Sequence, residues 1–63
     1  MSSLNGYDED DKRRIVNIAS QLVAGQIERG DIPMTDEAIR GAMPTAVTLA
    51  KQTVNAMWEF LSG

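Results

Sequence analysis

Residues 42–61 read AMPTAVTLAKQTVNAMWEFL, and they decide the fold because they carry two apolar series side by side. Both series advance by alternating steps of four and three residues, the spacing of an apolar helix seam. The first series contains Met43, Val47, Ala50, Val54, Met57 and Leu61. The second series contains Ala42, Ala46, Leu49, Thr53, Ala56 and Phe60. Together they cover about half of the helix circumference, an arc wider than one short partner helix can cover.

The length and composition of the chain favour oligomerisation as a source of stability. A monomer as short as these 63 residues buries only about 60% of its unfolded surface, so small domains rely on disulfides, metals or oligomerisation. The chain has no cysteine and no histidine, which removes disulfides, thiolate metal sites and the commonest general base. We therefore expect no cofactor and no metal, and a homodimer that supplies the missing burial.

Charge and hydropathy restrict the partners. The net charge is −3 and no basic face is evident, which argues against direct binding to nucleic acid. No apolar run approaches the roughly 18–20 residues of a membrane span, and the N-terminus lacks the pattern of a signal peptide. We therefore expect a cytoplasmic protein that does not associate with membranes.

The first half of the chain predicts a flexible N-terminus at 1–7 and a helix at about 8–29. The helix opens with a run of carboxylates, which complement the positive end of the helix dipole. This acidic run contains Asp8, Glu9, Asp10 and Asp11. Basic residues follow at 12–14, and their offset predicts i,i+4 ion pairs that begin with Asp8–Lys12. The run is interpreted either as a solvated first turn or as an acidic docking patch.

The second half predicts a helix that is divided near Pro44. Thr35 has the residue type and position of an N-cap, with two acidic residues after it. A proline inside a helix removes a hydrogen bond and clashes with the preceding turn. We therefore favour helices at 36–43 and 44–61 over one kinked helix. The expected fold is a single all-α domain at 8–63, a small helical hairpin or bundle completed by dimerisation.

The sequence contains no combination of residues that is typical of a catalytic site. Serine and threonine residues fall at caps, on polar faces or in the termini, and no base accompanies them. The paired carboxylates lie in a terminal run or at a helix start, where no cleft is expected to hold them. We expect no catalytic residues and no enzymatic activity.

The second series is the predicted interaction surface. The first helix can cover the first series with its own apolar stripe, which leaves the second series without an intramolecular partner. Trp58 lies on the rim of the apolar arc and Gln26 falls inside the arc of the first helix, where a polar residue can select one pairing. The predicted interface contains Gln26, Leu49, Thr53, Ala56, Trp58 and Phe60.

The arrangement of small and apolar residues also resembles a known class. It combines an Ala…Leu…Gly helix with a second alanine-rich amphipathic helix, and it spans residues 14–61. The residues that carry it are Arg14, Ala19, Leu22, Gly25, Ala42, Ala46, Ala50, Val54, Met57 and Leu61. This pattern resembles small helical accessory proteins of tailed phages and prophages. The resemblance implies a protein that binds a host or phage protein inside a bacterium, and it transfers no site residues.

The sequence thus predicts a helical protein–protein interaction module that forms a homodimer, binds another protein, or does both. Two alternatives remain. The first is an acidic monomeric inhibitor that mimics nucleic acid through residues 8–11. The second is a helical bundle that binds a small ligand in its interior.

Overall fold

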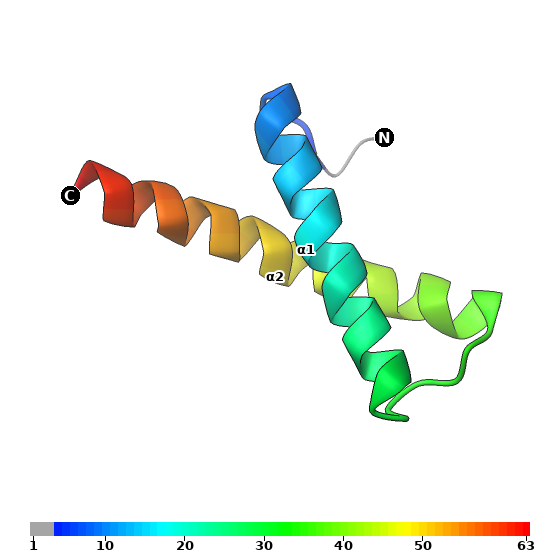
Figure 1. The fold of residues 1–63 in the computed structure, drawn as a ribbon. Coiled ribbons are helices and arrows are strands. Elements are labelled where there is room, and N and C mark those ends of the chain that lie inside the picture. Colours follow the sequence, from blue (N-terminus) through cyan, green and yellow to red (C-terminus); the bar gives the residue numbers. More distant parts are fainter. Residues whose placement is uncertain (1–3) are drawn as a thin grey trace.

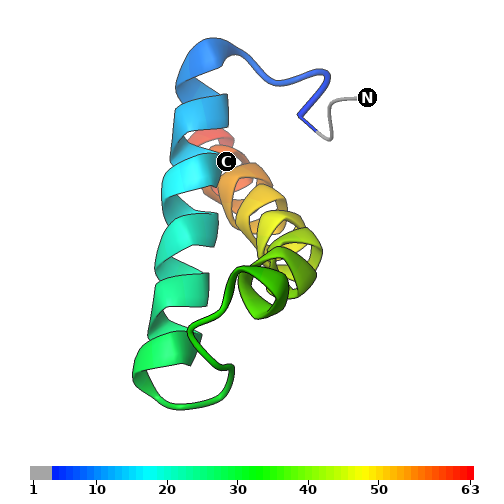
Figure 2. The same ribbon diagram turned by 90° about the vertical axis from the view of Figure 1, so that its right-hand side faces the viewer.

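The computed structural model describes residues 4–63 and contains two helices, α1 (Glu9–Glu28) and α2 (Asp36–Ser62). They cross near their middles, so that the ribbon forms an X whose two arms are joined by the loop at 29–35 (Figure 1). In the perpendicular view α2 passes α1 on one side (Figure 2). No strand occurs within residues 4–63. The predicted all-α helical hairpin is confirmed.

The start of α1 follows from its acidic run. Asp8 is the N-cap, and its Oδ1 accepts a hydrogen bond of 2.7 Å from the backbone N–H of Asp11. This bond satisfies one of the amide groups that a helix start leaves without a partner. The predicted i,i+4 ion pairs are wrong. Because Asp8 serves as the cap, the pairs have i,i+3 spacing and begin with Glu9–Lys12, at 3.3 Å.

Gly30 ends α1 with a Schellman motif. The backbone N–H of Gly30 donates to the carbonyl of Ile27, and that of Asp31 donates to the carbonyl of Gln26. This pair of hydrogen bonds requires a residue with positive φ at the turn, and Gly30 has φ +77°. The turn then directs the chain into the loop that leads to α2.

The structure corrects the predicted division at Pro44. Thr35 is the N-cap as predicted, and its Oγ1 accepts from the N–H of Ala38 at 3.2 Å. The helix then runs without a break to Ser62, with Pro44 inside it. Two separate helices at 36–43 and 44–61 are therefore wrong. Residues before and after Pro44 pack against the same core, and this shared packing holds the two halves in one helix.

The core is a contact between two rows of side chains with four-residue spacing. Six side chains are buried within residues 4–63: Ile15, Ala19, Val23, Ala46, Ala50 and Val54. Interdigitating rows of i,i+4 spacing favour a steep crossing of the two helices, and the ribbons of α1 and α2 cross as an X (Figure 1). Three of the six are alanines, which allow the two backbones to approach closely.

This packing changes which part of α2 is covered. We expected α1 to cover the first series along its length. Instead α1 crosses both series, and it buries Ala46 of the second series together with Ala50 and Val54 of the first. The end of the first series, with Met57 and Leu61, is exposed. A heptad seam needs nearly parallel helices, and these helices diverge.

The segment before α1 is more ordered than predicted. Leu4 and Tyr7 are half-buried and pack against the core, and the Tyr7 hydroxyl lies 3.2 Å from Oδ1 of Asn55. The predicted flexible N-terminus therefore does not extend over residues 4–7. The rest of that prediction, residues 1–3, lies outside the described residues.

Replacing Pro44 by alanine tests the continuous helix. The variant gives the Arg40 carbonyl an N–H donor, and we expect the free energy of unfolding to rise by about 1–3 kcal/mol. Urea denaturation followed by circular dichroism at constant protein concentration measures this change. Gln21→Ala, on the exposed side of α1, is the control and should change it by less than about 0.5 kcal/mol. A less stable Pro44→Ala variant would indicate a helix that begins at Pro44.

Candidate interaction surface

The C-terminal arm of α2, residues 55–63, extends beyond the buried core. The buried row ends at Val54, and every residue from 55 to 63 is exposed. The arm projects away from α1 at the end of the chain (Figure 1). Phe60 is 83% exposed although it is among the most apolar side chains of the protein. An exposed apolar arm of this kind is typical of a surface that binds another protein.

The predicted surface is exposed over most of its length. Leu49, Thr53, Ala56 and Phe60 are all exposed. Thr53 does not make this face polar, because its hydroxyl donates to the Leu49 carbonyl of the same helix at 2.8 Å. The series begins differently, since Ala42 is half-buried and Ala46 is buried against α1.

A groove of about 570 Å³ lies beside the start of the second series. It is formed by the second half of α1, the loop and the first half of α2. Its lining residues are Leu22, Gln26, Arg29, Ile32, Ala38, Gly41, Ala42, Thr45, Ala46 and Leu49. The wall that α2 provides consists of small side chains apart from Leu49, so the groove is open along this helix.

Gln26 lines this groove and is half-buried. It lies on the α1 wall, facing the same space as Leu49 of α2. At the rim, the guanidinium Nε of Arg29 is paired with Asp31 at 3.1 Å. Gln26 and Leu49, two residues of the predicted interface, thus line one groove, and the sequence gave no sign of the groove itself. The groove depends on the crossing of the helices, which the residue pattern does not fix.

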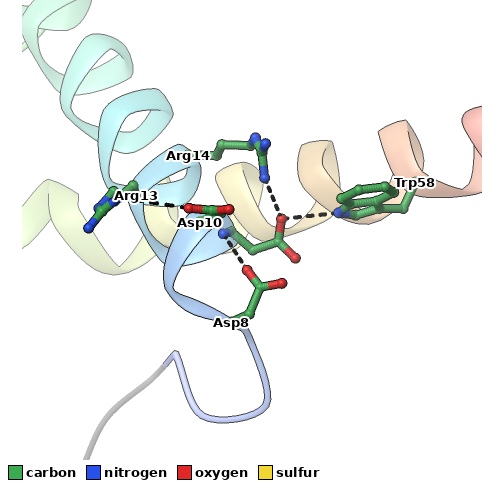
Figure 3. Close-up of polar contacts among 6 residues, drawn as sticks. Asp8, Asp10, Arg13, Arg14 and Trp58 are labelled. Carbon is green, nitrogen blue, oxygen red and sulfur yellow. Dashed lines mark hydrogen bonds and ion pairs between the residues drawn. The ribbon is translucent and has the colours of Figure 1, made fainter.

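Trp58 lies on another side of α2 from Phe60 and joins α2 to α1. Its indole Nε1 donates to Oδ1 of Asp11 at 3.1 Å, and the same oxygen accepts from Arg14 at 2.9 Å (Figure 3). The Asp11 side chain is only 14% exposed, whereas Trp58 is 45% exposed. Trp58 therefore contributes to the fold of the single chain, in addition to any role in an interface.

The contact between Asp11 and Trp58 was not predicted from the sequence. A signal for it exists in the spacing of the core rows. Asp11 stands four residues before Ile15, and Trp58 stands four residues after Val54. Asp11 and Trp58 therefore each extend a buried row by one step. Because the two rows run antiparallel, these two extensions lie at the same end of the core. This signal can be used only when it is known that the buried rows have four-residue spacing.

The acidic run does not form one uniform patch. Asp8 caps α1, Asp11 accepts from Trp58, and the other two carboxylates pair within the helix. Glu9 lies 3.3 Å from Lys12 and Asp10 lies 3.7 Å from Arg13. Each acidic side chain thus has a local partner, which is the arrangement expected of a paired first helical turn.

Within residues 4–63, no group of three carboxylates is placed to hold a metal ion. Neither α1 nor α2 combines the length and hydropathy that crossing a membrane requires. No protein-family model matches the chain, and comparison with curated proteins and with solved structures gave no match either.

Asp11→Asn tests the contact with Trp58. The amide is a weaker acceptor than the carboxylate for both the indole and Arg14, so we expect stability to fall by about 1 kcal/mol. Asp10→Asn is a matched control, because it removes the same charge from the same helical turn without touching Trp58. Thermal denaturation and tryptophan fluorescence measure the two effects. Equal losses in both variants would contradict a specific role for Asp11.

Proposed function

We propose that this protein is a small helical protein–protein interaction module and that a second copy of the chain binds to the second series of α2. The observation that carries the proposal is the exposed apolar arm of α2, in which Phe60 lies almost entirely in solvent. Burial of one such aromatic side chain removes about 150–250 Å² from water. Within residues 4–63, Tyr7 and Asp11 bond to Asn55 and Trp58 of this arm, and Phe60 stays 83% exposed.

The total surface of the chain supports this proposal. The accessible surface is 4758 Å² for a mass of 6.9 kDa, whereas a compact monomer of this mass exposes about 4000 Å². The chain thus exposes more surface than a compact monomer, partly because of its chain ends. This excess is of the same order as the roughly 800 Å² that each partner buries in a stable complex. A second copy can therefore bring the exposed surface to the level of a compact domain.

The shape of the chain supports the same conclusion. The Cα radius of gyration is 12.8 Å, compared with about 10.6 Å for a compact domain of this length. The extents are 39 × 26 × 15 Å, so the molecule is a thin plate of two crossed helices. A thin plate buries little apolar surface, and pairing two plates is the simplest way to enclose more.

The resemblance to phage accessory proteins carries a wider proposal. In this proposal the dimer binds a host or phage protein in the cytoplasm of a bacterium. The acidic alternative has less support, because the carboxylates of residues 8–11 are occupied in α1. The proposed function involves binding alone and no catalytic step.

Leu49→Glu tests dimerisation through the second series. A buried charge without a partner opposes association, so we expect the mass in solution to fall from twice 6.9 kDa to 6.9 kDa. Size exclusion with light scattering measures the mass, and circular dichroism checks that helicity is kept. Val16→Glu, which places the same charge on the exposed side of α1, should leave the dimer intact. A wild-type chain that is monomeric at ~100 µM, well above the Kd of a stable homodimer, would overturn the proposal.

A further inference from the structure

The spacing of the second series is symmetrical. Its steps of four, three, four, three and four residues read the same from either end. Two copies of α2 can therefore align this series on itself in opposite directions. In that alignment Ala42 lies opposite Phe60 of the second copy and Leu49 lies opposite Thr53. Ala46 is level with Ala56 but is already covered by α1 of its own chain. The largest side chain of the series thus meets one of its smallest.

A socket for Phe60 is present at the other end of the same helix. In helix packing, a protruding side chain enters a hole formed by four residues of the facing helix. The residues at i, i+3, i+4 and i+7 that begin at position 38 form such a hole. They are Ala38, Gly41, Ala42 and Thr45. All four are small, and all four line the groove.

The space above this hole is open in the single chain. A Cβ atom placed on Gly41 would have no heavy atom within 4 Å, and the adjoining groove measures about 570 Å³. The α1 wall adds Leu22 and Gln26 on the opposite side. The groove can therefore receive an aromatic side chain of the second copy that is directed at α2.

We propose that two chains pair with their α2 helices antiparallel, so that Phe60 of each copy fills the hole between residues 38 and 45 of the other. This arrangement rests on the proposed function, and it specifies the occupant of the groove. It is two-fold symmetric, and each groove is completed only by the other copy. Both grooves and both exposed arms are used, as a closed dimer requires.

A parallel pair is the less favourable arrangement. It would place Phe60 against Phe60 at one end and Ala42 against Ala42 at the other, so one end is crowded and the other leaves a void. It would also bring Glu59 of both copies to the same end. In the antiparallel pair, Thr45 lies near Glu59 of the second copy, and the two copies of Gln52 lie near each other. No like charges therefore meet within the paired series. It also opposes the two helix dipoles.

Cross-linking distinguishes the two directions, and the absence of native cysteine makes it straightforward. Thr45→Cys and Glu59→Cys are prepared separately, mixed at high concentration and treated with a short bismaleimide. In the antiparallel dimer the two positions face each other, and we expect a linked product in the mixture. Each variant alone should remain unlinked, because the two copies of position 45 are separated by about 18 Å along the helix, and those of position 59 by about 24 Å.

Ala56→Cys gives the opposite result. In the antiparallel dimer the two introduced thiols lie about 15 Å apart along the axis and form no disulfide. In a parallel dimer they are adjacent and become oxidised to a disulfide. A dimer that links through position 56 and not through the mixed pair overturns the antiparallel arrangement, while the proposed dimerisation stands. A monomeric wild-type chain overturns both.

Gly41→Leu tests the socket independently. The new side chain meets no atom of its own chain at its Cβ, and leucine favours a helix more than glycine does. The single chain should therefore stay folded. The side chain fills the hole that receives Phe60, so we expect the dissociation constant of the dimer to rise by about tenfold or more. Gly41→Ala is the control with a smaller obstruction. Unchanged dimerisation of Gly41→Leu, measured by sedimentation, overturns the socket.

Discussion

The fold depends on the contact between two rows of side chains that repeat every fourth residue. Ile15, Ala19 and Val23 of α1 meet Ala46, Ala50 and Val54 of α2, and nothing larger than valine or isoleucine is buried there. Rows of this spacing impose a steep crossing on the helices. The crossing in turn leaves the groove on one side and the projecting C-terminal arm at the other end of α2. The candidate interaction surface is therefore a consequence of how the core packs.

The local features of the fold were readable from the sequence because they depend on neighbouring residues alone. Asp8 and Thr35 act as caps through atoms three residues away, and Gly30 ends α1 because its turn needs a positive φ. The spacing of the ion pairs was wrong by one residue. That error has a local cause as well, since the carboxylate of Asp8 can either cap the helix or pair with Lys12.

The tertiary features could be predicted only in part. The second series was identified as the uncovered face, and four of its six members are exposed. The sequence did not predict how much of α2 is covered by α1, because α1 can cross a helix with two adjacent apolar series at different angles. For the same reason a break in the helix was predicted at Pro44. The packing on both sides of it, which sustains the helix, involves residues distant in sequence.

The hydrogen bond between Trp58 and Asp11 has a geometric consequence. The six buried side chains set the distance between the two axes and the steep angle at which they cross. The loop at 29–35 joins the helices on one side of this contact, and the indole bonded to Asp11 at 3.1 Å joins them on the other. The helices are thus tied together on both sides of the small core, and the polar contact helps to hold the direction in which the C-terminal arm points.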